Sequence, residues 1–111
     1  MTPRQNINNA ARLCRAVCGA LGGNADLIES QERPWASATF SGARHIITVR
    51  IPVDERDSTV PTLLAKLPDY EFNVPGEIVA DCVVSMQRHN RDCDGRLWLL
   101  CTVELLTILA D

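Results

Sequence analysis

Strict alternation of apolar residues in the last third of the chain constrains the fold most. In the run 96–109, every second residue from Leu99 to Leu105 is apolar, and the run 77–88 has the same period. A period of two predicts strands with one buried face. The stretch between the runs is rich in Asn, Asp and Gly, which predicts a hairpin turning at residues 90–94. The expected core pairs are Val84 with Leu99, Cys82 with Cys101, Ala80 with Val103 and Ile78 with Leu105.

A second region of period two covers residues 35–51 and predicts another hairpin. With Gly42-Ala43 as its turn, one face is apolar and the other is mostly polar. The expected core pairs are Phe40 with His45, Ala38 with Ile47 and Ala36 with Val49. The opposite face pairs Trp35 with Arg50, Ser37 with Thr48 and Thr39 with Ile46. Residues 24–34 are mostly polar, and we expect them to form a loop.

Two segments have helical periodicity. The first begins at Thr2-Pro3 and ends at Gly22-Gly23, and its apolar residues recur every three or four positions: Ile7, Ala11, Cys14, Cys18 and Leu21. The second is short, with Ser58 or Thr59 as its cap, Pro61 in its first turn and Pro68 ending it. The apolar stripe of this second helix consists of Val60, Leu63, Leu64 and Leu67.

The element order is therefore α-β-β-α-β-β within one α+β domain covering residues 1–111. This order predicts a two-layer sandwich, in which both helices cover one face of a four-stranded antiparallel sheet. Short connections favour the strand order 3-4-2-1, a permuted ferredoxin-like layout. Such layouts serve many unrelated functions, so the fold alone does not predict one.

Composition limits the classes of protein to which the chain can belong. No apolar run has the length of a membrane span and no apolar leader begins the chain, so we expect a cytoplasmic protein without membrane contact. Five cysteines without a Cys-x-x-Cys pair predict neither a disulfide framework nor a zinc site. The net charge is −3, and the six basic residues of the first 50 positions give that half a positive excess. We interpret the early arginines as the solvated face of a helix.

The stretch around the second turn has two interpretations. Asn90, Asp92 and Asp94 are spaced by two and followed by Gly95, as at the start of a calcium loop. The twelfth position, where a calcium loop carries a bidentate glutamate, is Cys101. Because Asn, Asp and Gly are also typical turn residues, we expect a hairpin turn and no cofactor. Asn90, Asp92 and Asp94 stay as weak candidates for metal ligands.

Candidates for catalysis are few. His89 and Cys93 could bind a metal or form a nucleophile–base pair, and Asp81 and Glu104 are diagonal on adjacent predicted strands. The sequence has no Gly-rich phosphate loop, nucleophile elbow or zinc-protease motif. We therefore assign no catalytic residue and expect a non-catalytic protein. A small-ligand or metal-binding enzyme-like domain is the alternative.

The outer face of the second hairpin is too apolar for a strand face that contacts water. Its apolar residues are Val79, Val83, Trp98, Leu100 and Leu106. A contiguous apolar patch is typical of an interface, so we expect a homodimer or a protein partner at these residues. Alternatively, residues 24–34 or the C-terminal tail cover the patch. A third interpretation, binding of single-stranded nucleic acid through Trp35, Trp98 and Arg50, is disfavoured by Asp81 and Glu104 on the same face.

Overall fold

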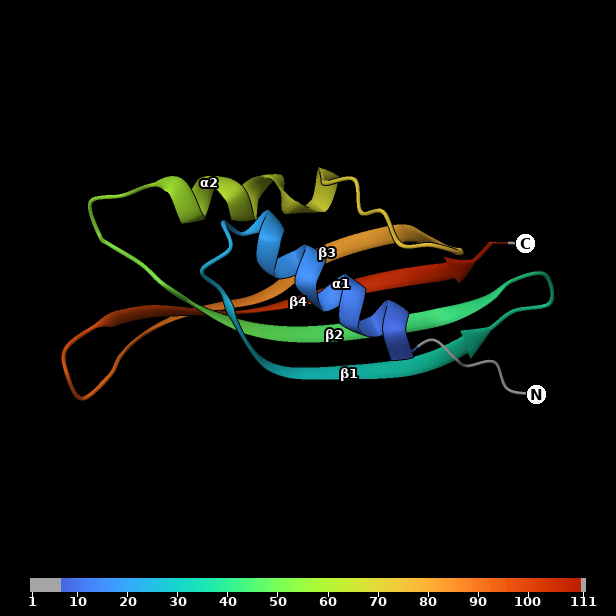
Figure 1. Ribbon diagram of the computed structural model, residues 1–111, viewed down its shortest axis with the longest axis horizontal. Coiled ribbons are helices and arrows are strands. Elements are labelled where there is room, and N and C mark those ends of the chain that lie inside the picture. Colours follow the sequence, from blue (N-terminus) through green and yellow to red (C-terminus); the bar gives the residue numbers. More distant parts are fainter. Residues whose placement is uncertain (1–6, 111) are drawn as a thin grey trace.

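The computed structural model describes residues 7–110 of the chain. Two helices, a short 3-10 helix and four strands follow one another along it, with these bounds: α1 (Ile7–Ala20), β1 (Asp26–Ala36), β2 (Ser41–Pro52), α2 (Thr59–Lys66), η1 (Leu67–Asp69), β3 (Glu77–Arg91) and β4 (Leu97–Leu109). The strands form one antiparallel sheet in the order β1-β2-β4-β3 (Figure 1). The predicted α+β fold and strand order are confirmed.

Helix α1 ends as its sequence predicts. Gly22 and Gly23 have positive φ angles of 101° and 83°, which side chains other than glycine's adopt only with strain. The Gly23 amide donates to the Cys18 carbonyl and the Gly22 amide to the Gly19 carbonyl, which is the Schellman pattern. The predicted start at Thr2-Pro3 lies outside the described residues.

The first hairpin turns at a different place from the one predicted. Residues 24–34 are not a loop, because β1 begins at Asp26. The chain turns at residues 37–40, so Ala36 pairs with Ser41 and Trp35 with Gly42. The Ser37 hydroxyl oxygen accepts from the amides of Thr39 and Phe40, which stabilises the turn. The prediction that Gly42-Ala43 forms the turn and that Phe40 faces His45 in the core is therefore wrong, since Phe40 lies in the turn and is 55% exposed.

The second hairpin turns at residues 92–96, two positions later than predicted. Strand β3 contains two β-bulges, between Val79 and Asp81 and between Val84 and Met86. Each bulge adds one residue to β3 and reverses the faces of the residues that follow it. Val84 therefore pairs with Val103 and Cys82 with Leu105, instead of the partners expected from an unbroken alternation.

The bulges also change which residues are buried. Cys82 is 5% exposed as expected, but Ile78, predicted as core, is 56% exposed, and Ala80 is exposed as well. The predicted core residues of β4 are all buried: Leu99, Cys101, Val103 and Leu105. The alternation of apolar residues therefore predicted burial correctly in the regular strand β4, but not throughout the bulged strand β3.

Helix α2 begins with a cap from a different residue than expected. One carboxylate oxygen of Asp57 accepts from both the amide and the hydroxyl of Thr59, at 2.9 and 2.6 Å, while Ser58 makes no side-chain cap. These bonds hold the pKa of Asp57 below its usual range. Helix α2 ends at Lys66, before Pro68 as predicted, and Pro68 lies in the short 3-10 helix η1 that follows.

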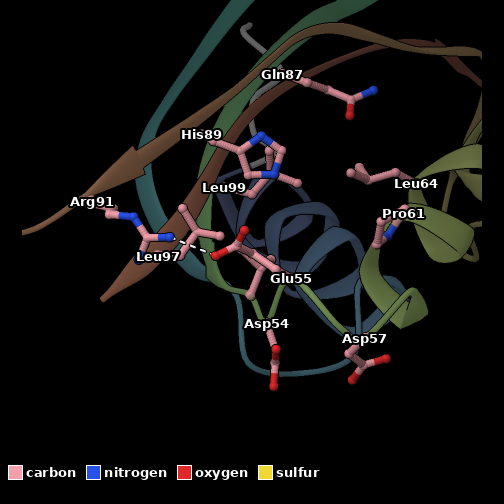
Figure 2. A pocket seen from close by; sticks show the side chains of 11 residues that line it. Asp54, Glu55, Asp57, Pro61, Leu64, Gln87, His89, Arg91, Leu97 and Leu99 are labelled. Atoms are coloured by element: carbon pink, nitrogen blue, oxygen red, sulfur yellow. Dashed lines mark hydrogen bonds and ion pairs between the residues drawn. The ribbon is translucent and has the colours of Figure 1, made fainter. Parts of the chain in front are cut away.

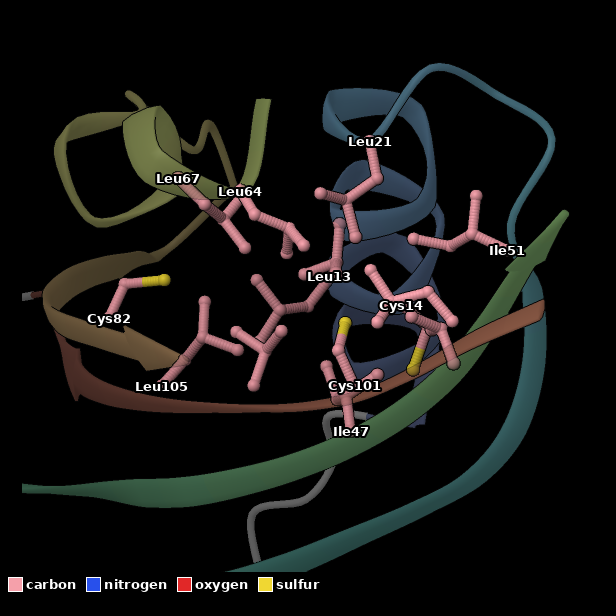
Figure 3. Packing of buried hydrophobic residues seen from close by; sticks show 14 of the residues in the cluster. Leu13, Cys14, Leu21, Ile47, Ile51, Leu64, Leu67, Cys82, Cys101 and Leu105 are labelled. Carbon is pink, nitrogen blue, oxygen red and sulfur yellow. The ribbon is translucent and has the colours of Figure 1, made fainter. Parts of the chain in front are cut away.

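Both helices pack against the same face of the sheet (Figure 3). The core consists mainly of aliphatic side chains, with Leu13, Val17 and Leu21 from α1, Leu64 and Leu67 from the second helical segment, and Ile47, Val49, Ile51, Val103 and Leu105 from the sheet. Cys14, Cys82 and Cys101 complete this layer as small apolar groups. The opposite face of the sheet contributes nothing to this core.

One buried polar pair interrupts the apolar layer. His45 is 3% exposed, and its Nε2 lies 3.3 Å from the hydroxyl of Thr107, which donates to the Ala43 carbonyl oxygen. Burial lowers the pKa of His45, although Glu32 and Glu77 oppose this effect. The imidazole is therefore neutral in the folded protein near pH 7. The prediction of a buried, hydrogen-bonded histidine is confirmed.

We expect the protein to lose stability in mild acid because of His45. As pH falls through about 6.5, the ordinary histidine value, the unfolded chain binds a proton that the folded protein resists. Urea unfolding at pH 7.5, 6.5 and 5.5 should show a fall of up to about 1.4 kcal/mol per pH unit. His45→Gln keeps a partner for Thr107 and should flatten this dependence. An equally steep fall in the variant would assign the effect to other groups.

Candidate functional site

The face of the sheet turned away from the helices, which we call the outer face, has no covering layer among the described residues (Figure 1). On β2 and β4 it carries the residues that alternate with the buried ones. Its apolar patch is formed by Ile46, Val83, Met86, Leu100, Leu106 and Ile108. These side chains are partly buried except for Val83, which is 46% exposed. The predicted candidates Val83, Leu100 and Leu106 thus lie on one face.

The unbroken alternation of residues 77–88 also places Gln87 on this face, so two residues assigned to it by the sequence, Val79 and Gln87, lie on the other one. Val79 pairs with the buried Thr107 and packs against the core, so its prediction as an outer-face residue is wrong. Gln87 pairs with the buried Cys101, on the helix side. Both errors come from the two bulges of β3. Met86 was missed for the same reason, whereas Ile108 continues the alternation of β4 and lies beyond the predicted pairs.

The sequence predicts Trp98 as an aromatic anchor at the centre of the patch, but it lies at one end of the outer face, paired with Pro52. Its indole nitrogen donates to the Asp92 carboxylate at 2.9 Å. The guanidinium carbon of Arg50 lies 4.3 Å from the ring centroid and that of Arg96 lies 5.1 Å from it. These two cation–π contacts and the hydrogen bond hold the ring in place. Trp98 is therefore already packed within the monomer, and it contributes a fixed, partly buried aromatic edge to the patch.

Polar pairs cross the middle of the face between neighbouring strands. The hydroxyls of Thr48 and Thr102 lie 3.0 Å apart, and Arg44 lies 3.9 Å from Glu104. Near the Trp98 end, Arg50 lies 3.7 Å from Asp26 of the edge strand β1. Exposed pairs of this kind contribute little to stability. Their consequence is a face with mixed charges between its apolar residues.

Neither segment proposed to cover the patch does so. Residues 26–36 form the edge strand β1 in the plane of the sheet, and β4 itself extends to Leu109. Within residues 7–110, both helices contact the inner face. The apolar patch therefore faces outward in the part of the chain that the model describes.

The candidate metal ligands of the second turn have structural partners. Asp92 accepts from the amides of Asp94 and Arg96 and from the Trp98 indole, and these bonds hold its pKa below the usual range. Asn90 belongs to β3 and pairs with Trp98. Gly95 completes the turn with a φ of 81°. Among the described residues, no group of three or more His, Cys, Asp or Glu side chains is placed to hold a metal ion.

A pocket of about 470 Å³ lies between the inner side of the β3–β4 hairpin, the β2–α2 loop and the start of α2 (Figure 2). Leu64, Leu97 and Leu99 supply apolar lining, and the exposed His89 is part of its wall. Arg91 and Glu55 form an ion pair of 2.7 Å beside it. A pocket of this volume can hold a small organic molecule. Cys93 is not among its lining residues, so the pocket does not contain the predicted histidine–cysteine pair.

The cysteines are all free thiols. Burial raises the pKa of Cys82 and of Cys101 to about 11, and it also raises that of Cys18. A thiol with a raised pKa is a poor nucleophile near neutral pH. Cys93 is the exposed one, at the hairpin turn. No arrangement of these thiols favours covalent chemistry.

The two tryptophans proposed as a stacking platform lie at opposite ends of the sheet. Trp35 pairs with Gly42 at one end, and Trp98 pairs with Pro52 at the other. The face between them carries Asp81 and Glu104, paired in register with Leu106 and Val83, respectively. A continuous basic groove with aromatic side chains, as single-stranded nucleic acid requires, is not formed by these residues.

The fold and the outer face together define a two-layer α+β sandwich domain with an uncovered, partly apolar sheet face. None of the described helices is long and apolar enough to cross a membrane. Comparisons with protein-family models, with curated proteins and with solved structures give no match to this chain.

Proposed function

We propose that the protein is a non-catalytic, self-associating module, in which the outer face binds the outer face of a second copy. The observation that carries this proposal is the apolar patch on a sheet face without a covering layer. In a two-layer sandwich that face contacts water and is expected to be polar. Contiguous apolar surface is the usual mark of an interface, whereas single exposed apolar residues are not.

The dimensions of the outer face fit a dimer interface. The molecule measures 49 Å along its longest axis, along which the strands run, and 25 Å along the next (Figure 1). A stable interface buries about 800 Å² on each partner. Two sheets that pack face to face lie about 10 Å apart and interdigitate their side chains. A four-stranded face of this length can supply the required area.

The charges of the outer face favour a second copy of the chain as the partner over a molecule whose surface is uniformly positive or uniformly negative. By register, the face carries as many carboxylates as guanidiniums, namely Asp26, Glu29, Asp81 and Glu104 against Arg33, Arg44, Arg50 and Arg88. Interfaces place opposite charges against each other. A neutral face with mixed charges can complement itself, whereas a nucleic acid or a strongly acidic protein requires a positive surface.

Association through the faces is favoured over association through the sheet edges. Free edges can pair with another strand, and proteins prevent this with bulges, prolines and charges. Strand β3 has two bulges, and β1 has one bulge, Pro34 and several charged residues. Both edges are therefore poor templates for an added strand.

The test is the mass of the protein in solution. Sedimentation of the unmodified chain from 1 to 200 μM should give a dimer, and Ile108→Glu should give a monomer. In the monomer, residue 108 is only partly buried on the outer face, where it pairs with Gly42 and Ile78, so the new carboxylate reaches water and folding should be preserved. In the dimer, the same charge is buried against the second copy without a cation in register, which costs several kcal/mol.

Phe40→Glu is the matched control. It replaces an apolar side chain that is 55% exposed in the β1–β2 turn, away from the outer face, and should leave the mass unchanged. The proposal is wrong if the unmodified chain sediments as a monomer at all concentrations, or if Ile108→Glu remains a folded dimer. Circular dichroism of each variant reports on folding.

A further inference from the structure

The charged residues of the two edge strands indicate how the two copies are oriented, if the proposed self-association is correct. One line across the sheet runs from Asp26 on β1 through Arg50 and Leu100 to Arg88 on β3. A second line runs from Arg33 through Arg44 and Leu106 to Asp81. Each line thus has opposite charges at its two ends, and the sign is reversed between the lines.

Of these four end residues, Arg33, Asp81 and Arg88 form no ion pair within residues 7–110, and Asp26 lies 3.7 Å from Arg50. All four are exposed. The three unpaired charges, and Asp26 in its long, exposed pair, lie at the rim of an apolar patch, where charges set a partner's orientation more than its affinity.

Face-to-face dimers with two-fold symmetry have few possible orientations. A two-fold axis that runs along the strands, between β2 and β4, places β1 of one copy over β3 of the other. This rotation does not change the position of a residue along the strand direction. Each line of residues therefore lies over the same line of the second copy, with the β1 end of one over the β3 end of the other. The charge at one end of a line then meets the opposite charge.

We infer that the two copies associate about this axis, with Arg33 of each copy facing Asp81 of the other and Asp26 facing Arg88. Packed sheets are rotated by about 30°, which displaces the outer strands by a few ångströms. Arginine side chains are long enough to span that offset. The same axis places Trp35 over Ile78, since both lie on the line that passes through Gly42 and Ile108. Ile78 is 56% exposed in the monomer and would lose that exposure in the dimer.

A two-fold axis perpendicular to the strands is the competing orientation. It places each strand over the same strand of the second copy, running in the opposite direction. If Asp26 then faces Arg33 of the second copy, Arg88 faces Asp81 of the second copy. In that arrangement, however, Arg50 lies over Arg44 of the second copy, since both belong to the central strand β2. Like charges in contact at an interface are costly, which favours the axis along the strands.

A charge exchange within one chain tests the inferred axis. Arg33→Asp and Asp81→Arg should each raise the dimer dissociation constant by about tenfold or more, because each places two like-charge contacts in the dimer. The double variant Arg33→Asp/Asp81→Arg should recover the affinity of the unmodified protein, because it exchanges the signs of residues that face each other. Sedimentation at about 0.1 M salt measures all three, since higher salt screens the charges.

The perpendicular axis predicts the opposite result for the double variant. About that axis, Asp26 would face the aspartate introduced at position 33, and Arg88 would face the arginine introduced at position 81. The double variant would therefore associate more weakly than either single variant. That result, or a dissociation constant unchanged in all three variants, would overturn the inference. If the unmodified protein dimerises and Ile108→Glu abolishes the dimer, the proposed function stands even when the inferred axis fails. A monomeric unmodified protein overturns both.

Discussion

Gly42→Ala should lower the free energy of unfolding by about 3 kcal/mol or more, the largest effect that we expect from any one-carbon change in the sheet. A Cβ at position 42 would collide with the carbonyl oxygen of Thr107, and it would lie 2.8 Å from the Thr107 carbonyl carbon and 3.0 Å from the Cα of Ile108. All three atoms belong to the backbone of β4, so no side chain can move aside. The central strands β2 and β4 would have to separate.

Thermal unfolding followed by circular dichroism measures this effect, which corresponds to a fall of the melting temperature by more than about 10 °C in a domain of this size. Gly19→Ala is the matched control. Gly19 lies in the last turn of α1, and an added Cβ would meet nothing within 4 Å. Alanine is the better helix former, so this variant should be more stable by about 0.5–1 kcal/mol. Equal melting temperatures for the two variants would contradict the collision at Gly42.

Regular strands were the part of the fold that the sequence predicted well. In β2 and β4, every second residue from His45 to Ile51 and from Leu99 to Leu105 is buried, because both strands lie in the middle of the sheet under the helices. Burial of one complete face imposes the period of two on the sequence. The strand order followed from the same pattern and from the short connections.

Strand β1 could not be recognised in this way. It lies at the edge of the sheet, and all of its residues except the partly buried Trp35 are exposed. Since neither face of β1 is fully buried, its sequence carries no alternation, and it is indistinguishable from a polar loop. Its hydrogen bonds to β2, which no side-chain pattern records, make it a strand.

The candidate site was predicted in part for a related reason. Leu100 and Leu106 belong to the regular strand β4, and their position on the outer face followed from alternation. Val79 was assigned to the wrong face because a bulge separates it from Asp81. A bulge depends on local backbone geometry and on the partner strand, so the residue sequence of β3 alone does not locate it.

Neighbouring leucines of β4 provide the second large prediction, because they separate folding from association. Leu105 is 0% exposed, pairs with Cys82 and lies in the core, whereas Leu106 is partly exposed on the outer face. Leu105→Ala should lower the free energy of unfolding by about 2–5 kcal/mol, from lost burial and from the cavity left in a packed layer. Measured by urea unfolding of the monomer at low concentration, Leu106→Ala should cost about 1 kcal/mol or less.

Association should respond in the reverse order. Leu106→Ala removes apolar area from the proposed interface on both copies and should raise the dimer dissociation constant by about tenfold or more, as measured by sedimentation. Leu105→Ala leaves the outer face unchanged, so its folded fraction should dimerise with the affinity of the unmodified protein. A dimer weakened equally by both substitutions would show that association depends on overall stability and not on the outer face. Because the two residues are adjacent and chemically identical, only the face that each side chain occupies can produce opposite results.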